Sequence, residues 1–112
     1  MDRTNSAKQI VAMYERHGWT LKRVLLTPET RAQFGAENFK EAAIVDSTFD
    51  ALWFARPSSE RREAWELRLL SENPYALFEA FEAGEAEEDR EDARHEMENR
   101  MREHATASQR SA

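Results

Sequence analysis

Four polar side chains in the middle of the chain have types and spacing that suit a metal site. Asp46 and Asp50 stand four residues apart, and Glu66 and Arg68 alternate in a later segment. Carboxylate oxygens are the ligands that Mg²⁺ prefers, and a bound Mg²⁺ can activate water and stabilise charge on a phosphoryl group. This set is therefore a candidate site for metal-assisted phosphodiester hydrolysis, with Asp46 and Glu66 as the central residues.

The same residues resemble the PD-(D/E)xK pattern of metal-dependent nucleases. In that family two acids hold the metal and a lysine orients the attacking water. Here Asp46 would take the acid position and Glu66-Leu67-Arg68 the E-x-K position. Arg68 replaces the lysine, and a guanidinium stays protonated and cannot act as a base. The alternative interpretation is structural: the two aspartates flank a turn, and Glu66 and Arg68 form the solvent face of a strand.

Other catalytic motifs have little support in the sequence. Glu91, His95, Glu98 and His104 have helical spacing but no H-E-x-x-H pattern, so an exposed charged helix is the alternative to a metal site. There is no cysteine, which excludes disulfides and thiolate metal sites. No G-x-S-x-G motif and no glycine-rich phosphate loop occur. We therefore expect no cofactor.

Three arginines surround a predicted turn and offer a different chemistry. Arg56, Arg61 and Arg62, together with Trp53 or Trp65, could contact an anion or a nucleic acid. The alternative is a solvated loop, because neighbouring glutamates neutralise much of its charge. The formal net charge of -6 gives no reason to expect a basic face, so nucleic acid is a disfavoured partner.

The segments that must position these residues begin with a helix. Residues 6–17 carry an apolar stripe with helical spacing, Ser6 has N-cap spacing, and Gly18 suits a helix C-terminus with Trp19 packing on Tyr14. Residues 20–26 follow as a strand. Thr27, Pro28 and Glu29 then predict the start of a short helix over 28–34 that ends at Gly35. The length of this connection allows a right-handed crossover between parallel strands.

Residues 43–82 hold most of the aromatic side chains and predict four short strands. The strands lie at about 42–46, 51–55, 63–70 and 75–81. In 63–70 the alternation of Trp65, Leu67 and Leu69 with polar residues favours a strand, although the residue types also suit a helix. In the last strand, Ala76, Phe78 and Ala80 should share one face.

The C-terminal segment is the most charged part of the chain. Residues 85–112 contain 9 acids and 5 arginines, a net charge of -4. We expect a domain over 1–84 and, over 85–112, a charged tail that is helical or disordered, frayed to about His104 and disordered beyond it. The tail is a candidate contact segment and could also fold back on the three arginines.

These features predict an α+β protein with an N-terminal helix, a strand, a short helix and an antiparallel β-meander. The 13 arginines and 3 lysines suggest a GC-rich bacterial genome, and the lack of a leader or a membrane-length apolar run indicates a soluble cytoplasmic protein without a membrane partner. We expect the sheet face with Trp53 or Trp65 to be exposed for association, including homodimer formation. The residues favour a non-enzymatic protein-interaction or regulatory module over the metal-dependent phosphodiesterase alternative.

Overall fold

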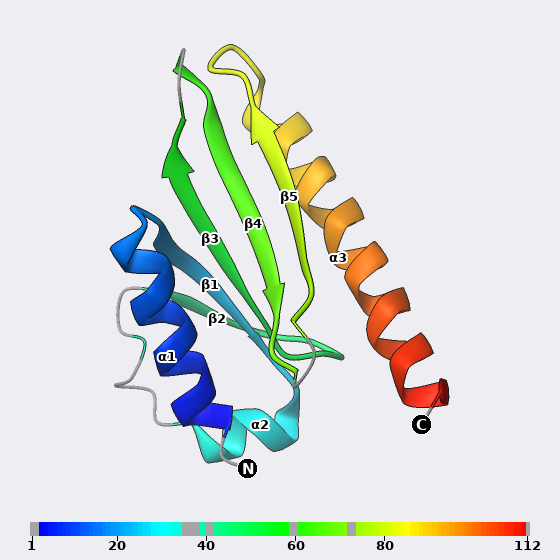
Figure 1. Ribbon diagram of the computed structural model, residues 1–112. Coiled ribbons are helices and arrows are strands. Elements are labelled where there is room, and N and C mark those ends of the chain that lie inside the picture. The colour runs from blue at the N-terminus through cyan, green and yellow to red at the C-terminus, as the bar shows by residue number, and fades with distance from the viewer. Residues whose placement is uncertain (1–2, 35–38, 40–41, 59–60, 72–73, 112) are drawn as a thin grey trace.

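The computed structural model describes residues 3–34, 39, 42–58, 61–71 and 74–111. Within them the helices and strands follow one another along the chain as in Figure 1. Their bounds are α1 (Arg3–Arg16), β1 (Thr20–Leu26), α2 (Pro28–Gln33), β2 (Ala43–Asp46), β3 (Ala51–Pro57), β4 (Glu63–Leu69), β5 (Ala76–Phe81) and α3 (Glu87–Ser111). The predicted α+β class is confirmed, and the segment predicted as a strand over 63–70 forms β4, which ends at Leu69.

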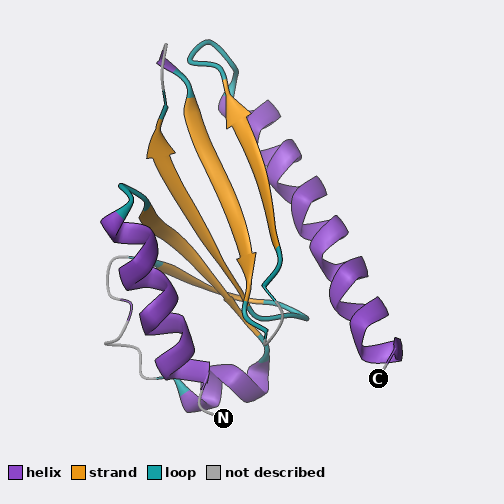
Figure 2. Ribbon diagram, viewed as in Figure 1, coloured by secondary structure: helices purple, strands orange, loops and turns teal. Residues whose placement is uncertain are grey.

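The five strands form one sheet in the order β2-β1-β3-β4-β5 (Figure 2). β1 and β2 are parallel, as the crossover length allowed, and the other neighbours are antiparallel. The prediction of a plain four-stranded meander over 43–82 is wrong, because β1 lies between β2 and β3. The burial of Val24, Leu25 and Leu26 agrees with this interior position, because side chains on both faces of β1 are covered.

α1 lies over one face of the sheet and starts earlier than predicted. It begins at Arg3, so Ser6 lies inside the helix and is not its N-cap. Thr4 and Ala7 are buried, which extends the packed stripe one turn upstream. The C-terminal prediction is confirmed: Gly18 has φ +87°, and the Trp19 amide donates to the Tyr14 carbonyl at 3.1 Å. The Tyr14 and Trp19 rings are in contact, with centroids 6.0 Å apart.

α2 is held to the sheet by Asp50, which precedes β3. Thr27 caps the helix, and its own backbone amide donates to Asp50 at 2.7 Å. The Thr30 hydroxyl donates to the same carboxylate at 2.6 Å. The Gly35 stop lies outside the described residues, and the helix ends at Gln33.

The sheet separates two apolar clusters. On the α1 and α2 side the buried residues are Ala7, Tyr14, Val24, Leu26, Phe34, Phe39, Leu52, Phe54 and Leu70. On the α3 side they are Leu25, Phe49, Ala51, Trp53, Ala55, Trp65, Leu67, Leu69, Phe81, Met97 and Met101.

The C-terminal segment forms a long helix, α3, and is not the partly disordered tail that we predicted. The helix continues to Ser111, so the disorder predicted beyond His104 is not found. Met97 and Met101 are buried against the sheet, which means that the helix packs as a layer of the fold (Figure 1). Among the described residues, no helix has the length and apolar character needed to cross a membrane.

Candidate interaction surface

The four residues of the predicted metal site lie in different places. Asp46 ends β2, at one edge of the sheet, and accepts a hydrogen bond from Arg31. Glu66 lies on β4, three strands away, which corresponds to roughly 14 Å across a sheet. Asp50, just before β3, is buried against the first turn of α2, as described above. The fold therefore does not bring Asp46 and Glu66 to one site.

Glu66 and Arg68 point toward α1, into the same layer as Tyr14. The Tyr14 hydroxyl donates to the Glu66 carboxylate, and the Tyr14 ring stacks on Phe54 with centroids 4.1 Å apart. Burial, and secondly the hydrogen bond to Glu66, raise the pKa of Tyr14 to about 12, with Arg68 acting in the opposite direction. This contact joins α1 to β4 and gives Glu66 a structural role.

The four predicted residues of α3, Glu91, His95, Glu98 and His104, each have a separate partner. His95 lies 3.5 Å from Glu91 of the same helix. Glu91 accepts two hydrogen bonds from Arg23 of β1, each 2.9 Å long. Glu98 accepts from the indole of Trp53 at 2.8 Å. The His104 ring stacks on Tyr75 with centroids 3.5 Å apart. In the described part of the chain, no three acids or histidines are grouped so that they could hold a metal ion.

The two tryptophans predicted for an exposed face lie beneath α3. Trp53 is 0% exposed and Trp65 is 8% exposed, and their rings meet edge to face at 5.8 Å. The expectation of an open aromatic face is therefore corrected. Its physical reason is that α3 supplies Met97 and Met101 as an apolar cover, which the charged composition of the segment concealed.

Arg94 is the α3 side chain that sequence reasoning missed. It is 2% exposed, and its guanidinium carbon lies 4.3 Å from the centre of the Trp65 ring. Its Nη2 donates to Glu87 and, at 3.1 Å, to Glu91. A buried arginine that is both stacked and ion-paired lets an acidic helix pack on an aromatic face.

The three predicted arginines do not act together. Arg56 lies 4.8 Å from the centre of the Trp19 ring and donates to the His17 carbonyl at 2.9 Å. Arg62 pairs with Glu82 at 2.9 Å. Arg61 is exposed and has φ +67°. We considered that the C-terminal segment could fold back on these three arginines. In the structure, Glu91 and Glu98 of α3 instead contact Arg23 and the Trp53 indole.

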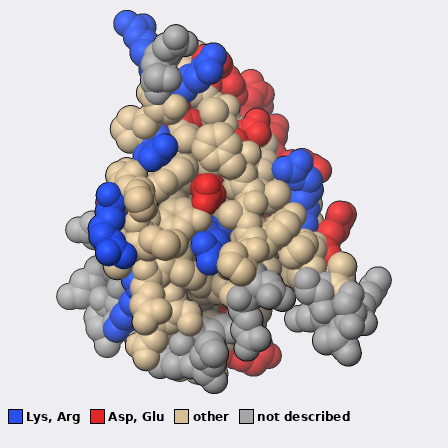
Figure 3. Space-filling model, viewed as in Figure 1, with Lys and Arg blue, Asp and Glu red and all other residues tan. Residues whose placement is uncertain are grey.

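The exposed aromatic side chain lies elsewhere, on β5. Phe78 is 55% exposed and faces the α1 side of the sheet. Its ring meets Trp19 edge to face, with centroids 6.5 Å apart. We call Trp19, Arg56, Phe78 and the exposed Ala76 and Ala80 the Trp19–Phe78 surface. In Figure 3 many of the acidic side chains gather along the α3 side, while the middle of this view is mostly tan, with acidic and basic groups near one another at its centre.

The backbone of β5 adds directional groups to this surface. The Leu69 amide donates to the Tyr75 carbonyl at 2.9 Å, which makes this a hydrogen-bonded pair of the antiparallel ladder. Such pairs alternate, so the ladder register turns the backbone of Leu77 and Glu79 toward β4. It turns the amides and carbonyls of Ala76, Phe78 and Ala80 outward. β5 is the last strand of the described sheet, so these groups line its outer edge.

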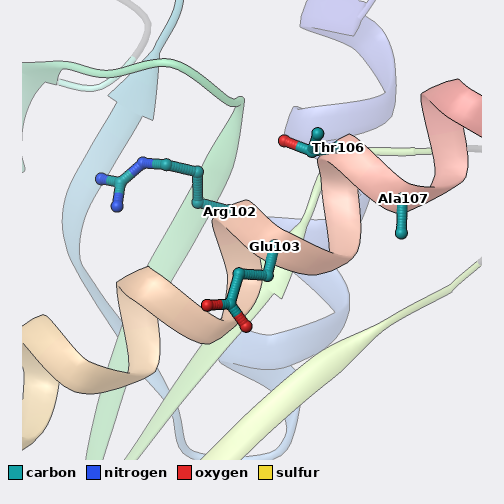
Figure 4. A pocket seen from close by; sticks show the side chains of 4 residues that line it. All are labelled: Arg102, Glu103, Thr106 and Ala107. Atoms are coloured by element: carbon teal, nitrogen blue, oxygen red, sulfur yellow. The ribbon is translucent and has the colours of Figure 1, made fainter.

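A separate open hollow of about 480 Å³ lies beside the C-terminal half of α3 (Figure 4). Its described lining residues are Arg102, Glu103, Thr106 and Ala107. All four belong to one helix, and Arg102 is already bonded to Thr48 at 3.0 Å and to Asn99 at 2.8 Å. Polar groups from different elements therefore do not converge among the described lining residues of the hollow.

We compared the chain with known proteins and found no relative. No protein-family model, curated protein or solved structure matches the chain.

Proposed function

We propose that this chain is a non-enzymatic protein-interaction module that binds an extended protein segment along the outer edge of β5. The observation that carries the proposal is the position of Phe78, which is 55% exposed at the middle of the edge strand β5. Among the described strands, β5 pairs only with β4, on its inner side. Strand addition supplies main-chain hydrogen bonds from the edge and uses side-chain contacts for selectivity.

The two edges of the sheet differ in a way that supports this assignment. β2 has four residues and ends in the charged Asp46, which are common devices for protecting an edge. β5 has six residues, Ala76–Phe81, with no lysine and no proline, and its one charge is Glu79. An unprotected apolar edge either aggregates or has a partner.

The neighbouring side chains shape what the edge can accept. Ala76 and Ala80 are small, so an incoming strand can approach on both sides of Phe78. Trp19 widens the apolar contact, and Arg56 places a positive charge against its ring. The fitting ligand is thus an extended segment with an apolar side chain opposite Phe78 and an acid near Arg56.

The test compares Phe78→Lys with Val45→Lys. Val45 is a matched control because it is 41% exposed on the opposite edge strand. Affinity capture from the native host's lysate should yield a partner that the wild type and Val45→Lys retain and that Phe78→Lys loses. Hydrogen exchange on the reconstituted complex should then show protection of the Phe78 and Ala80 amides. A partner that binds Phe78→Lys as well as the wild type would overturn the proposal.

A further inference from the structure

We infer that the segment that adds to β5 is β5 of a second copy of this chain, paired antiparallel with Phe78 opposite its own copy. This inference rests on the proposed function and names its partner. It follows from the open backbone groups of β5, from the alternation of its side chains and from the position of its single charge.

A two-fold axis perpendicular to the sheet restricts the pairing. Opposed residues of an antiparallel pair point to the same face of the sheet. The axis must therefore lie midway between one residue and the same residue of the second copy, so that this residue is opposite itself. An axis at Phe78 places Ala76 opposite Ala80 of the second copy. All three positions turn their amides and carbonyls outward, so this register forms about six backbone hydrogen bonds.

The charge on the strand selects among the registers. An axis at Glu79 would place two carboxylates directly opposite each other, with Cβ atoms about 5 Å apart, which is destabilising. An axis at Phe78 instead places Glu79 opposite Leu77 of the second copy. An axis at Leu77 would bring Ala80 opposite Pro74, which has no amide to donate. Of these three registers, the one centred on Phe78 avoids both the opposed carboxylates and the proline.

The side chains gain contacts in the same register. The two Phe78 rings would lie side by side on the α1 face, each already in edge contact with its own Trp19. Aromatic cross-strand pairs are among the stabilising ones in antiparallel sheets. The pairing therefore covers the most exposed aromatic side chain among the described residues.

The net charge of the chain determines how dimer formation should depend on salt. Each chain carries a formal charge of -6, so two copies repel each other at low ionic strength. Salt screens that repulsion, and dimer formation should strengthen as salt rises. Binding to nucleic acid would show the opposite trend.

The association experiment is sedimentation velocity on the full chain from about 1 to 300 µM at low and high salt, a range that spans typical weak dimers. We expect a concentration-dependent dimer that strengthens with salt. Phe78→Lys should raise its Kd at least about tenfold, because it removes the burial of an aromatic side chain. Val45→Lys should leave the Kd unchanged. A chain that remains monomeric throughout would overturn the inference.

A cysteine experiment tests the register without altering Phe78. The chain contains no cysteine, so Ala76→Cys and Ala80→Cys each introduce a single thiol. Opposed residues lie about 5.5 Å apart at Cα, within the range that a disulfide spans. After oxidation, a mixture of the two variants should give a disulfide-linked dimer, and neither variant alone should. A dimer whose mixed variants do not cross-link would overturn the register.

The two proposals fail in distinguishable ways. A monomeric chain that still captures another protein through Phe78 would reject the second copy as partner and leave the interaction module standing. If Phe78→Lys changes neither self-association nor capture, both proposals are rejected. Its unfolding midpoint in urea, measured in parallel, shows whether the variant is folded.

Discussion

The guanidinium of Arg94 lies over the indole of Trp65, with its central carbon 4.3 Å from the ring centre. One residue belongs to the most acidic helix of the chain and the other to a sheet strand, and both are buried. Arg94 also binds Glu87 and Glu91, so a single side chain neutralises part of α3 and attaches it to the sheet.

Arg94→Lys should destabilise the fold although it keeps the charge. A lysine ammonium cannot stack its flat face on Trp65 while binding two carboxylates, so we expect a loss of about 1–2 kcal/mol. Arg94→Ala should cost about 3 kcal/mol, because the packing of the side-chain stem is lost as well. Urea unfolding followed by tryptophan fluorescence measures both. Equal stability of Arg94→Lys and wild type would show that the stacking contributes nothing.

Removal of α3 should prevent stable folding of residues 1–84. The helix covers Trp53, Trp65 and Phe81, and their exposure would create a large apolar face. The truncated chain should bind a hydrophobic dye, lose cooperative unfolding and aggregate. For this reason, loss of a partner on truncation would not by itself locate the contact on α3. A cooperative, monomeric 1–84 fragment would contradict this expectation.

Glu91→Gln should show how pH changes the stability that the contact between Glu91 of α3 and Arg23 of β1 contributes. The hydrogen bonds from Arg23, and secondarily that from Arg94, lower the pKa of Glu91 to about 2 from an ordinary 4.5. The contribution of the ionised Glu91 to the free energy of unfolding is therefore complete above pH 4.5 and is lost as the pH falls toward 2. Because Glu91 is about a third exposed, we expect about 1 kcal/mol between wild type and variant at pH 7. Urea titrations at several pH values should show this gap narrowing below pH 4.5.

Tyr14 should ionise with a pKa of about 12, above its ordinary value of 10.0. Since the folded pKa is the raised one, the associated stability is present below pH 10 and is lost as the pH rises through 12. Ultraviolet titration in a Tyr75→Phe background isolates Tyr14. Glu66→Gln should lower the Tyr14 pKa but keep it above 10, because burial is the larger cause. A value of 10 or below in that variant would assign the shift to Glu66.

Asp50→Ala should destabilise the protein more than Asp50→Asn. The carboxylate accepts from the Thr27 amide and the Thr30 hydroxyl, and alanine would leave both donors without this acceptor. We expect a cost of about 2–3 kcal/mol for alanine and roughly half of that for asparagine, which keeps one acceptor oxygen. Chemical denaturation provides the comparison. Equal losses would indicate that the negative charge, and not the hydrogen-bonding geometry, matters.

Local signals predicted much of the chain's secondary structure. Thr27-Pro28 marks the start of α2, and Gly18 marks the end of α1, because capping and positive φ depend on a few adjacent residues. The alternation in 63–70 correctly favours a strand over a helix. The predicted face shared by Ala76, Phe78 and Ala80 is also confirmed, because side chains alternate along any strand.

Only the tertiary structure decided which aromatic residues are covered. Trp53 and Phe78 both lie on strands with apolar neighbours, yet one is 0% exposed and the other 55% exposed. The difference arises because α3 packs over one face, held by Arg94 and Glu98, while the opposite face near β5 has no such cover among the described residues. Long-range pairing also placed β1 between β2 and β3, and so separated Asp46 from Glu66. Spacing along a chain fixes periodicity, but neighbours across a sheet depend on the burial of all strands together.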